Sequence, residues 1–298
     1  MERLGDHNMP AGLHADWNDC LRLGKKGEST FVAFQLYYAM SMMHELAAER
    51  KDSEYVSYLD KAQKALGEAL AACWDEDRFI RGIREDGVVV GAKKDPEASM
   101  WLNPQSWSVI SGFASKEQSD KAMQSVADIL DTPYGAKLLD PPYIDHYFDG
   151  ALMHIFNPDT KENGGIFSQS QGWLILAESL LGHGDDAFRY FEESSPASMN
   201  DKAEQRVLEP YVHGQFTEST ASPYAGRSHV HWLTGTASTV MVGCVEGICG
   251  MRPDADGLHI CPSIPAAWDG FTMEKLFRGK QLSITVKNPN HVQSGVAS

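Results

Sequence analysis

The sequence lacks the basic charge that binding to nucleic acids or anionic membranes requires. It holds 26 Lys and Arg against 41 Asp and Glu, a formal net charge of −15. Both kinds of partner need clustered positive side chains, so we expect neither. No segment approaches 18 uninterrupted apolar residues, and the first residues, "MERLGDHNMPAG", contain no apolar core of a signal peptide. These absences predict a cytoplasmic protein.

Cysteine pairs and the common metal or nucleotide motifs are also missing. The five cysteines form no CxxC pair, which favours reduced thiols over a disulfide framework or a zinc site. There is no Walker A, GxSxG or HExxH motif. His229 and His231 have HxH spacing in a possible strand, but without a third ligand in register they are more typical of packing histidines. We expect no metal and no organic cofactor.

The chain is rich in apolar residues with helical periodicity. Over 28–50, large apolar side chains recur every three or four residues, and the pattern repeats over 52–73. Further helices are predicted at 103–115, 116–130, 170–184, 184–194 and 231–250, and short β segments at 77–92. Helix pairs separated by long loops are typical of an α/α toroid. A helical repeat array gives similar signals, although no fixed period is evident.

The composition changes near residue 253. The following stretch is rich in proline and glycine, and "KQLSITVKNP" alternates apolar and polar residues through Leu282, Ile284 and Val286. We therefore predict a helical catalytic domain at 1–252 and a β module at 253–298. The module is too short for a core of its own, so we expect it to be truncated.

The stretch "ADWNDC" at 15–20 places two acids around an indole and an amide. Asp and Asn satisfy free backbone N–H groups, so a turn or helix cap is one interpretation. The other is a sugar site, in which Trp17 stacks on a pyranose and Asn18 binds hydroxyl groups. Asp16 or Asp19 would then donate a proton, helped by an apolar neighbour that raises the carboxyl pKa.

Two later stretches carry similar chemistry. In "KENGGIFSQSQGW" at 161–173, Glu162 and Asn163 suit sugar hydroxyl groups, and Gln169 near a helix start could face an anion. A loop followed by a cap explains this stretch equally well. In "LEPYVHGQF" at 208–216, an acid, Glu209, lies in a polar and aromatic loop.

A fourth stretch, "AGRSHVHWLTGTAS" at 225–238, leads into an apolar segment. Within it, Thr234 and Gly235 open or interrupt the predicted helix, and glycine permits close approach of the backbone to a ligand.

In this order the motifs "ADWND", "KENGGIF", "EPYV" and "GRSHVHWLTGTAS" resemble the inverting disaccharide phosphorylases of glycoside hydrolase family 94. "DGLHICPSIPAAWDGF" at 256–271 resembles the start of that family's C-terminal β domain. The resemblance implies a mainly α fold, a partial (α/α)6 barrel followed by the beginning of a β-sandwich module. It also implies that the N-terminal sandwich and the first barrel helices are missing, and that the full-length protein is a homodimer.

The resemblance implies phosphorolysis of a β-linked glucosyl disaccharide with inversion, giving an α-sugar 1-phosphate and a released acceptor. Inorganic phosphate would be the co-substrate. Asp19 matches the general acid of the family, and Trp17 matches the residue that packs against the donor sugar. Asp16 would support or bind the substrate.

The phosphate site is implied only in part. Thr234 and Gly235 match a Thr-Gly pair that holds phosphate in the family, whereas Gln169 stands where the family has a histidine. The family's upstream arginines are absent from this sequence. Glu209 matches an acidic residue near the active site, with a substrate-binding or supporting role.

Two alternatives remain open from the sequence. One is an inverting (α/α)6 hydrolase that uses Glu209 or Glu162 as a base, and the other is an incomplete sugar-binding fragment. The acceptor is open between glucose, N-acetylglucosamine and gluconate.

Overall fold

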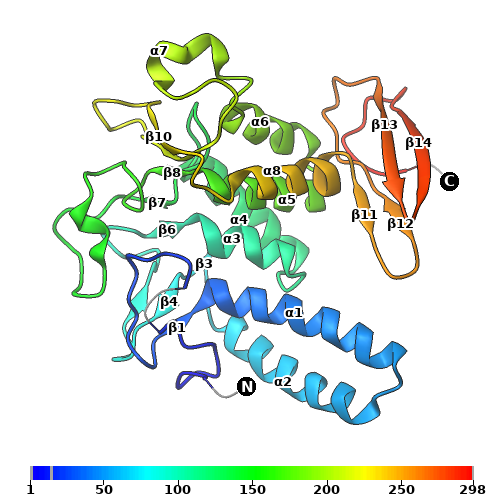
Figure 1. Cartoon of the computed structure of the whole chain (residues 1–298). Coiled ribbons are helices and arrows are strands. Elements are labelled where there is room, and N and C mark those ends of the chain that lie inside the picture. Colours follow the sequence, from blue (N-terminus) through cyan, green and yellow to red (C-terminus); the bar gives the residue numbers. More distant parts are fainter. Residues whose placement is uncertain (1–2, 14–15, 297–298) are drawn as a thin grey trace.

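The computed structural model describes residues 3–13 and 16–296 and consists of paired helices with a C-terminal β region (Figure 1). The pairs are α1 (Thr30–Glu49) with α2 (Ser53–Ala71), α3 (Leu102–Ile110) with α4 (Lys116–Ile129), and α5 (Ser168–Leu181) with α6 (Gly184–Ser194). Helix α1 packs on α3, α3 on α5, and α5 on α8 (Thr236–Val242). These four helices form one row, and α2, α4 and α6 lie against it as their partners.

Local sequence explains where these helices begin and end. Ser29 caps α1 by accepting a hydrogen bond from the amide of Val32, and Asp52 caps α2 in the same way. Ser115 and Gln118 form a reciprocal capping box at α4. Gly182 ends α5 in a left-handed conformation, with φ of 81°. The six predicted helices up to residue 194 are confirmed, with ends that differ by a few residues.

Long loops between the helix pairs contain short antiparallel strands. Strand β8 (Ile166–Phe167) pairs with β9 (Gly214–Thr217), which pairs with β10 (Ser228–His231). The short β segments predicted at 77–92 are confirmed. The remaining short strands are β1 (Glu28–Ser29), β2 (Trp74–Asp75), β3 (Arg78–Phe79), β4 (Gly82–Ile83), β5 (Val89–Val90), β6 (Met100–Trp101) and β7 (Leu139–Asp140). Short helical turns lie at Leu152–Ile155, Asn200–Lys202 and α7 (Ala203–Arg206).

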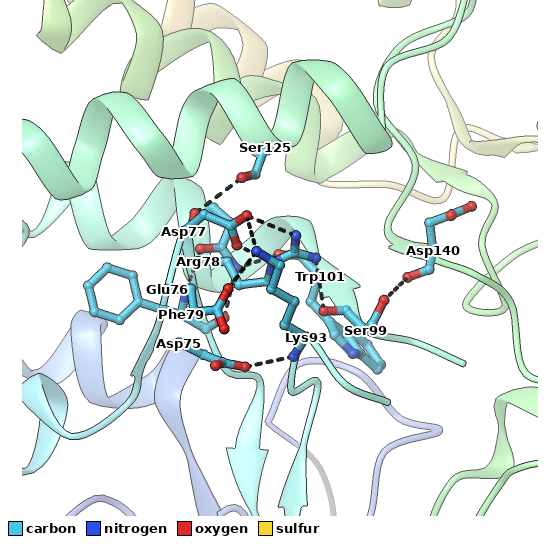
Figure 2. A network of polar contacts seen from close by, with 11 residues as sticks. Asp75, Glu76, Asp77, Arg78, Phe79, Lys93, Ser99, Trp101, Ser125 and Asp140 are labelled. Carbon is cyan, nitrogen blue, oxygen red and sulfur yellow. Dashed lines mark hydrogen bonds and ion pairs between the residues drawn. The ribbon is translucent and has the colours of Figure 1, made fainter. Parts of the chain in front are cut away.

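A polar network fixes the β2–β3 hairpin to its surroundings (Figure 2). The ammonium of Lys93 lies 2.8 Å from Glu76 and 2.9 Å from Asp77. Ser125 on α4 donates to the carbonyl of Asp77, and Arg78 donates to the carbonyl of Ser99. The network therefore ties the hairpin to α4 and to the loop before β6.

The predicted helix at 231–250 is wrong in its first quarter, residues 231–235. Strand β10 continues to His231, and α8 begins only at Thr236 before passing into a π-helix over Gly243–Ile248. Val230 and Trp232 have φ of 53° and 68°. A right-handed helix cannot include these backbone conformations, and pairing with β9 holds the segment extended instead. The possible strand around His229 is confirmed.

The C-terminal region is made of two antiparallel hairpins. Strand β11 (Met251–Pro253) pairs with β12 (Leu258–Ile260), and β13 (Gly270–Phe277) pairs with β14 (Lys280–Lys287). The predicted alternating strand is thus confirmed as β14. Trp268, Phe271 and Val286 pack against the core formed by α3, α4, α5 and α6. The fold is therefore a helical domain joined to a β region. Within the described residues, no helix is both long enough and apolar enough to span a bilayer.

Candidate active site

The loop carrying Trp17 is built from two consecutive Asx turns. Oδ1 of Asp16 accepts from the amide of Asn18 at 3.3 Å, and Oδ1 of Asn18 accepts from the amide of Cys20 at 2.9 Å. Trp17 between them has φ of 104°, a strained conformation for a bulky residue. The turn interpretation is confirmed, and the same turns leave Asp19 exposed.

Asp16 anchors this loop through a buried ion pair. Its two oxygens lie 2.5 and 2.7 Å from the guanidinium of Arg81, and Ser29 Oγ donates to the carboxylate at 2.5 Å. Burial alone would raise the pKa of Asp16, but Arg81, Ser29 and the Asn18 amide hold the pKa below its ordinary value. With the Asn18 amide included, four donors fill the acceptor positions of the carboxylate. Asp16 therefore anchors the loop, and its predicted contact with the substrate stays a prediction.

Trp17 connects the loop to α5. Its indole N–H donates to Oε1 of Gln169 at 3.0 Å, and its ring packs edge-on against Phe167 and Trp173, with centroids 5.1 and 5.5 Å away. Gln169 lies in the first turn of α5. The structure thus brings together the predicted sugar platform and a predicted phosphate-binding residue.

The predicted phosphate-binding residues lie next to one another. A Cβ added to Gly235 would lie 3.1 Å from Nε2 of Gln169, so this backbone passes close to the amide. Thr239 Oγ1 donates to the carbonyl of Gln169 at 2.9 Å and fixes the start of α8 against α5. Thr234 Oγ1 accepts from the amide of Thr236. Gln169, Thr234 and Gly235 therefore form one polar corner.

Glu162 is a buried carboxyl group whose pKa is raised. Burial raises the pKa of Glu162 and the nearby Asp19 carboxylate adds to the rise, while Lys161 opposes it. Glu162 is 6% exposed, and its Oε2 has no hydrogen-bond partner among the described residues. Nδ2 of Asn18, the residue before Asp19, is also buried and has no partner among the described residues. Unsatisfied buried polar atoms beside an exposed carboxylate indicate a binding site.

Asn163 makes its hydrogen bonds to two neighbouring loops. Its Oδ1 accepts from the amide of Tyr143 at 2.7 Å, and its Nδ2 donates to the carbonyls of Tyr143 and Phe156. Both donors are used and the residue is fully buried, so Asn163 fastens two loops together. Its predicted contact with sugar hydroxyl groups stays a prediction.

Glu209 lies on an exposed loop beside another indole. Its Oε2 accepts from Nε1 of Trp232 at 2.8 Å, and its backbone carbonyl accepts from Arg206. Glu209, in the loop between α7 and β9, therefore contacts the β10–α8 connection that also carries Thr234. Its predicted role at the substrate stays a prediction.

Sequence reasoning missed Arg81 and Glu218. Nε2 of His229 lies 2.6 Å from Oε1 of the buried Glu218, and the imidazole stacks on Phe216 with centroids 4.8 Å apart. Phe216 belongs to the apolar cluster that includes Trp17. The HxH spacing singles out His229, but no sequence pattern links His229 to Glu218. Arg81 gave no signal at all, because its partner lies 65 residues away.

Two groups of side chains among the described residues have ligand atoms close enough to hold a metal ion. They are Glu178 with His183 and Asp186, and Asp254 with Asp256 and His259. Neither group includes a residue of the candidate site.

Comparison with known proteins gives a consistent result. Residues 1–250 match the catalytic domain of the glycosyl hydrolase 94 superfamily, and residues 251–295 match the C-terminal domain of glycosyl hydrolase family 65. The chain is 37% identical to the N,N'-diacetylchitobiose phosphorylase of Vibrio furnissii, with 100% of this chain and 37% of the relative aligned. It is 31% identical to the solabiose phosphorylase of Paenibacillus borealis, with 98% and 39% aligned.

A cellobionic acid phosphorylase of Neurospora crassa is 33% identical over 92% of this chain and 36% of its own length. The chain thus spans a little over a third of the length of the curated relatives it matches. Since the match to the catalytic domain covers residues 1–250, this chain belongs to the glycosyl hydrolase 94 superfamily.

Proposed function

We propose that this chain carries the catalytic centre of an inverting disaccharide phosphorylase. The substrate would be a β-linked glucosyl disaccharide, and the products an α-sugar 1-phosphate and a free acceptor sugar. The observation that carries the proposal is the link from the exposed Asp19, through Trp17 and Gln169, to Thr234 and Gly235. The names of its relatives as phosphorylases of chitobiose, solabiose and cellobionic acid support it.

In the proposed reaction Asp19 gives its proton to the bridging oxygen as the glycosidic bond breaks. A phosphate oxygen attacks the anomeric carbon from the opposite face and forms the new C–O bond, which inverts the configuration. The incoming phosphate takes the place of water, so no general base is needed. Trp17 would hold the donor sugar, and the buried Glu162 would accept hydrogen bonds from its hydroxyl groups.

Phosphate would bind at the corner between α5 and α8. Gln169 Nε2 and the Thr234 hydroxyl supply neutral donors there, and the absence of a side chain on Gly235 lets the anion approach the backbone. Within this proposal the row α1, α3, α5 and α8 is part of an (α/α)6 barrel. The homodimer of the full-length protein and its cytoplasmic location stay predictions.

One observation favours an inverting hydrolase as the second candidate. Besides burial, the Asp19 carboxylate raises the pKa of Glu162, and two carboxylates are what such a hydrolase needs, one as acid and one as base for water. A product assay with chitobiose, cellobiose and cellobionic acid separates the two. Sugar 1-phosphate formed only when phosphate is added supports phosphorolysis, whereas free sugars formed at equal rates without phosphate support hydrolysis.

A further inference from the structure

Trp232 is an exposed indole on a strained backbone. Its side chain is 70% exposed and the next residue, Leu233, is 72% exposed. The φ of Trp232 is 68° and that of Val230 is 53°, conformations that are costly for bulky and β-branched residues. Both strain and exposure of a large apolar ring cost free energy, and such features concentrate where a protein binds something.

The indole is held in place by one hydrogen bond. Nε1 of Trp232 donates to Oε2 of Glu209 at 2.8 Å. The second oxygen of this carboxylate, Oε1, makes no hydrogen bond within the described part of the chain. The result is an apolar ring face, fixed in orientation, with an unused hydrogen-bond acceptor at its edge.

This pair is connected to the candidate active site. Trp232 precedes Gly235 by three residues, and Gly235 lies against Gln169, which holds Trp17. The connection contains no flexible linker, because β10 pairs with β9 immediately before it and α8 begins immediately after it. A ligand that extends beyond the sugar at Trp17 would find its second aromatic surface on this segment.

We propose that Trp232 is the platform for the acceptor sugar and that Glu209 makes the site select neutral acceptors. A pyranose ring offers a face of C–H bonds that packs on an indole, and its hydroxyl groups donate to a carboxylate oxygen. An acceptor that is itself a carboxylate meets the charge of Glu209 and is repelled. This inference rests on the proposed function and specifies its substrate class. Glu209 is a positioning residue for the indole as well as a selecting charge.

The first test measures the binding of monosaccharides to the 298-residue chain by ligand-observed NMR titration. N-acetylglucosamine is the neutral probe and gluconate is the acidic probe. Loss of stacking in Trp232→Ala is expected to weaken N-acetylglucosamine binding about tenfold. Glu209→Gln keeps an oxygen for the indole but removes the charge, so gluconate binding should strengthen. Tyr224→Ala, at another exposed ring, serves as the control and should change neither affinity.

The second test is synthesis from an α-sugar 1-phosphate and the same acceptors. Trp232→Ala should raise KM for N-acetylglucosamine and leave KM for the sugar 1-phosphate unchanged. If Trp232→Ala binds N-acetylglucosamine as the wild type does and has the same KM for it, the platform role is overturned. The same conclusion follows if Trp232→Ala loses self-association but binds N-acetylglucosamine unchanged. If the wild type consumes no sugar 1-phosphate, the proposed function fails, while the titration still decides whether Trp232 binds the neutral sugar.

Discussion

The indole of Trp17 donates to the side-chain oxygen of Gln169 across 3.0 Å, although 152 residues separate the two in sequence. Because this bond uses the oxygen of the amide, the NH2 group of Gln169 is turned towards Gly235. One side chain thus orients the candidate sugar platform and supplies a donor to the candidate phosphate corner. Substitutions at Gln169, Thr234 or Gly235 should therefore weaken phosphate binding more than they reduce the stability of the fold.

Gly235→Ala should raise KM for phosphate with little loss of stability. The added Cβ would lie 3.1 Å from Gln169 Nε2, so the amide must move by a few tenths of an ångström. The φ of Gly235 is −80°, which alanine adopts without strain. Initial rates at varied phosphate measure the effect. The matched control is Gly257→Ala, where the new Cβ meets nothing within 4 Å. Equal phosphate KM in both variants would contradict the role of this corner.

Asp16→Asn should destabilise the fold, since it leaves the guanidinium of Arg81 buried without its counter-charge. Breaking a buried pair in this way costs about 3–5 kcal/mol, measurable as the free energy of unfolding in urea. Asp6→Asn, at the exposed pair with Lys26, should change stability little. A loss no larger than that of the control would contradict the anchoring role.

The same ion pair predicts an acid dependence. Although burial opposes it, Arg81, Ser29 and the Asn18 amide hold the pKa of Asp16 below its ordinary value in the folded protein, so its contribution is complete above about pH 4 and disappears as the pH falls through the folded pKa. Urea unfolding midpoints measured from about pH 5 down to about pH 2 should therefore fall on acidification in the wild type. Asp16→Asn should show a smaller fall.

His183 predicts the opposite dependence at higher pH. The hydrogen bond that His183 Nδ1 donates to Oε2 of Glu178 raises the pKa of His183, although burial opposes the rise. Burial in turn raises the pKa of Glu178. Stability from the charged imidazole is therefore complete below about pH 6.5 and is lost as the pH rises through the folded pKa. In His183→Gln, the free energy of unfolding in urea should no longer fall between about pH 6.5 and pH 9. His231→Gln changes an exposed side chain and should show the same fall as the wild type.

Asp19→Asn should abolish turnover without unfolding the protein. The side chain is exposed and makes no hydrogen bond within the described residues, so stability should match the wild type. Loss of a positioned general acid reduces rate by about 10²–10⁴-fold. Asp201→Asn, another exposed aspartate, is the control and should retain full activity. Wild-type rates in Asp19→Asn would assign the proton transfer to another group.

Most of the helical architecture follows from short-range sequence signals. The stripe of Leu59, Leu66 and Leu70 on α2 and the Ser115 cap of α4 act within one or two turns, so periodicity and capping identify them. The start of α8 could not be found in this way. Its upstream residues are apolar enough for a helix, yet strand pairing with β9 determines their conformation.

In the candidate site, too, local motifs identify some residues, whereas the roles of others depend on partners distant in sequence. Trp17, Gln169 and Gly235 were predicted from motifs, and the structure brings them together. The local pattern leaves Asp16 and Asp19 both open as proton donors, and only the family motif points to Asp19; the ion pair of Asp16 with Arg81, a partner distant in sequence, has no local signal. The bond from the Tyr143 amide to Asn163, 20 residues away, has no local signal either.

In the proposed reaction phosphate, not water, breaks the glycosidic bond, and ³¹P NMR of the reaction with N,N'-diacetylchitobiose and cellobiose distinguishes the two nucleophiles. We expect the inorganic phosphate signal to decline while an α-sugar 1-phosphate signal grows in equal amount, and omission of phosphate to stop the release of acceptor. Release of two free sugars at the same rate with and without phosphate, and no phosphate ester signal, would contradict it.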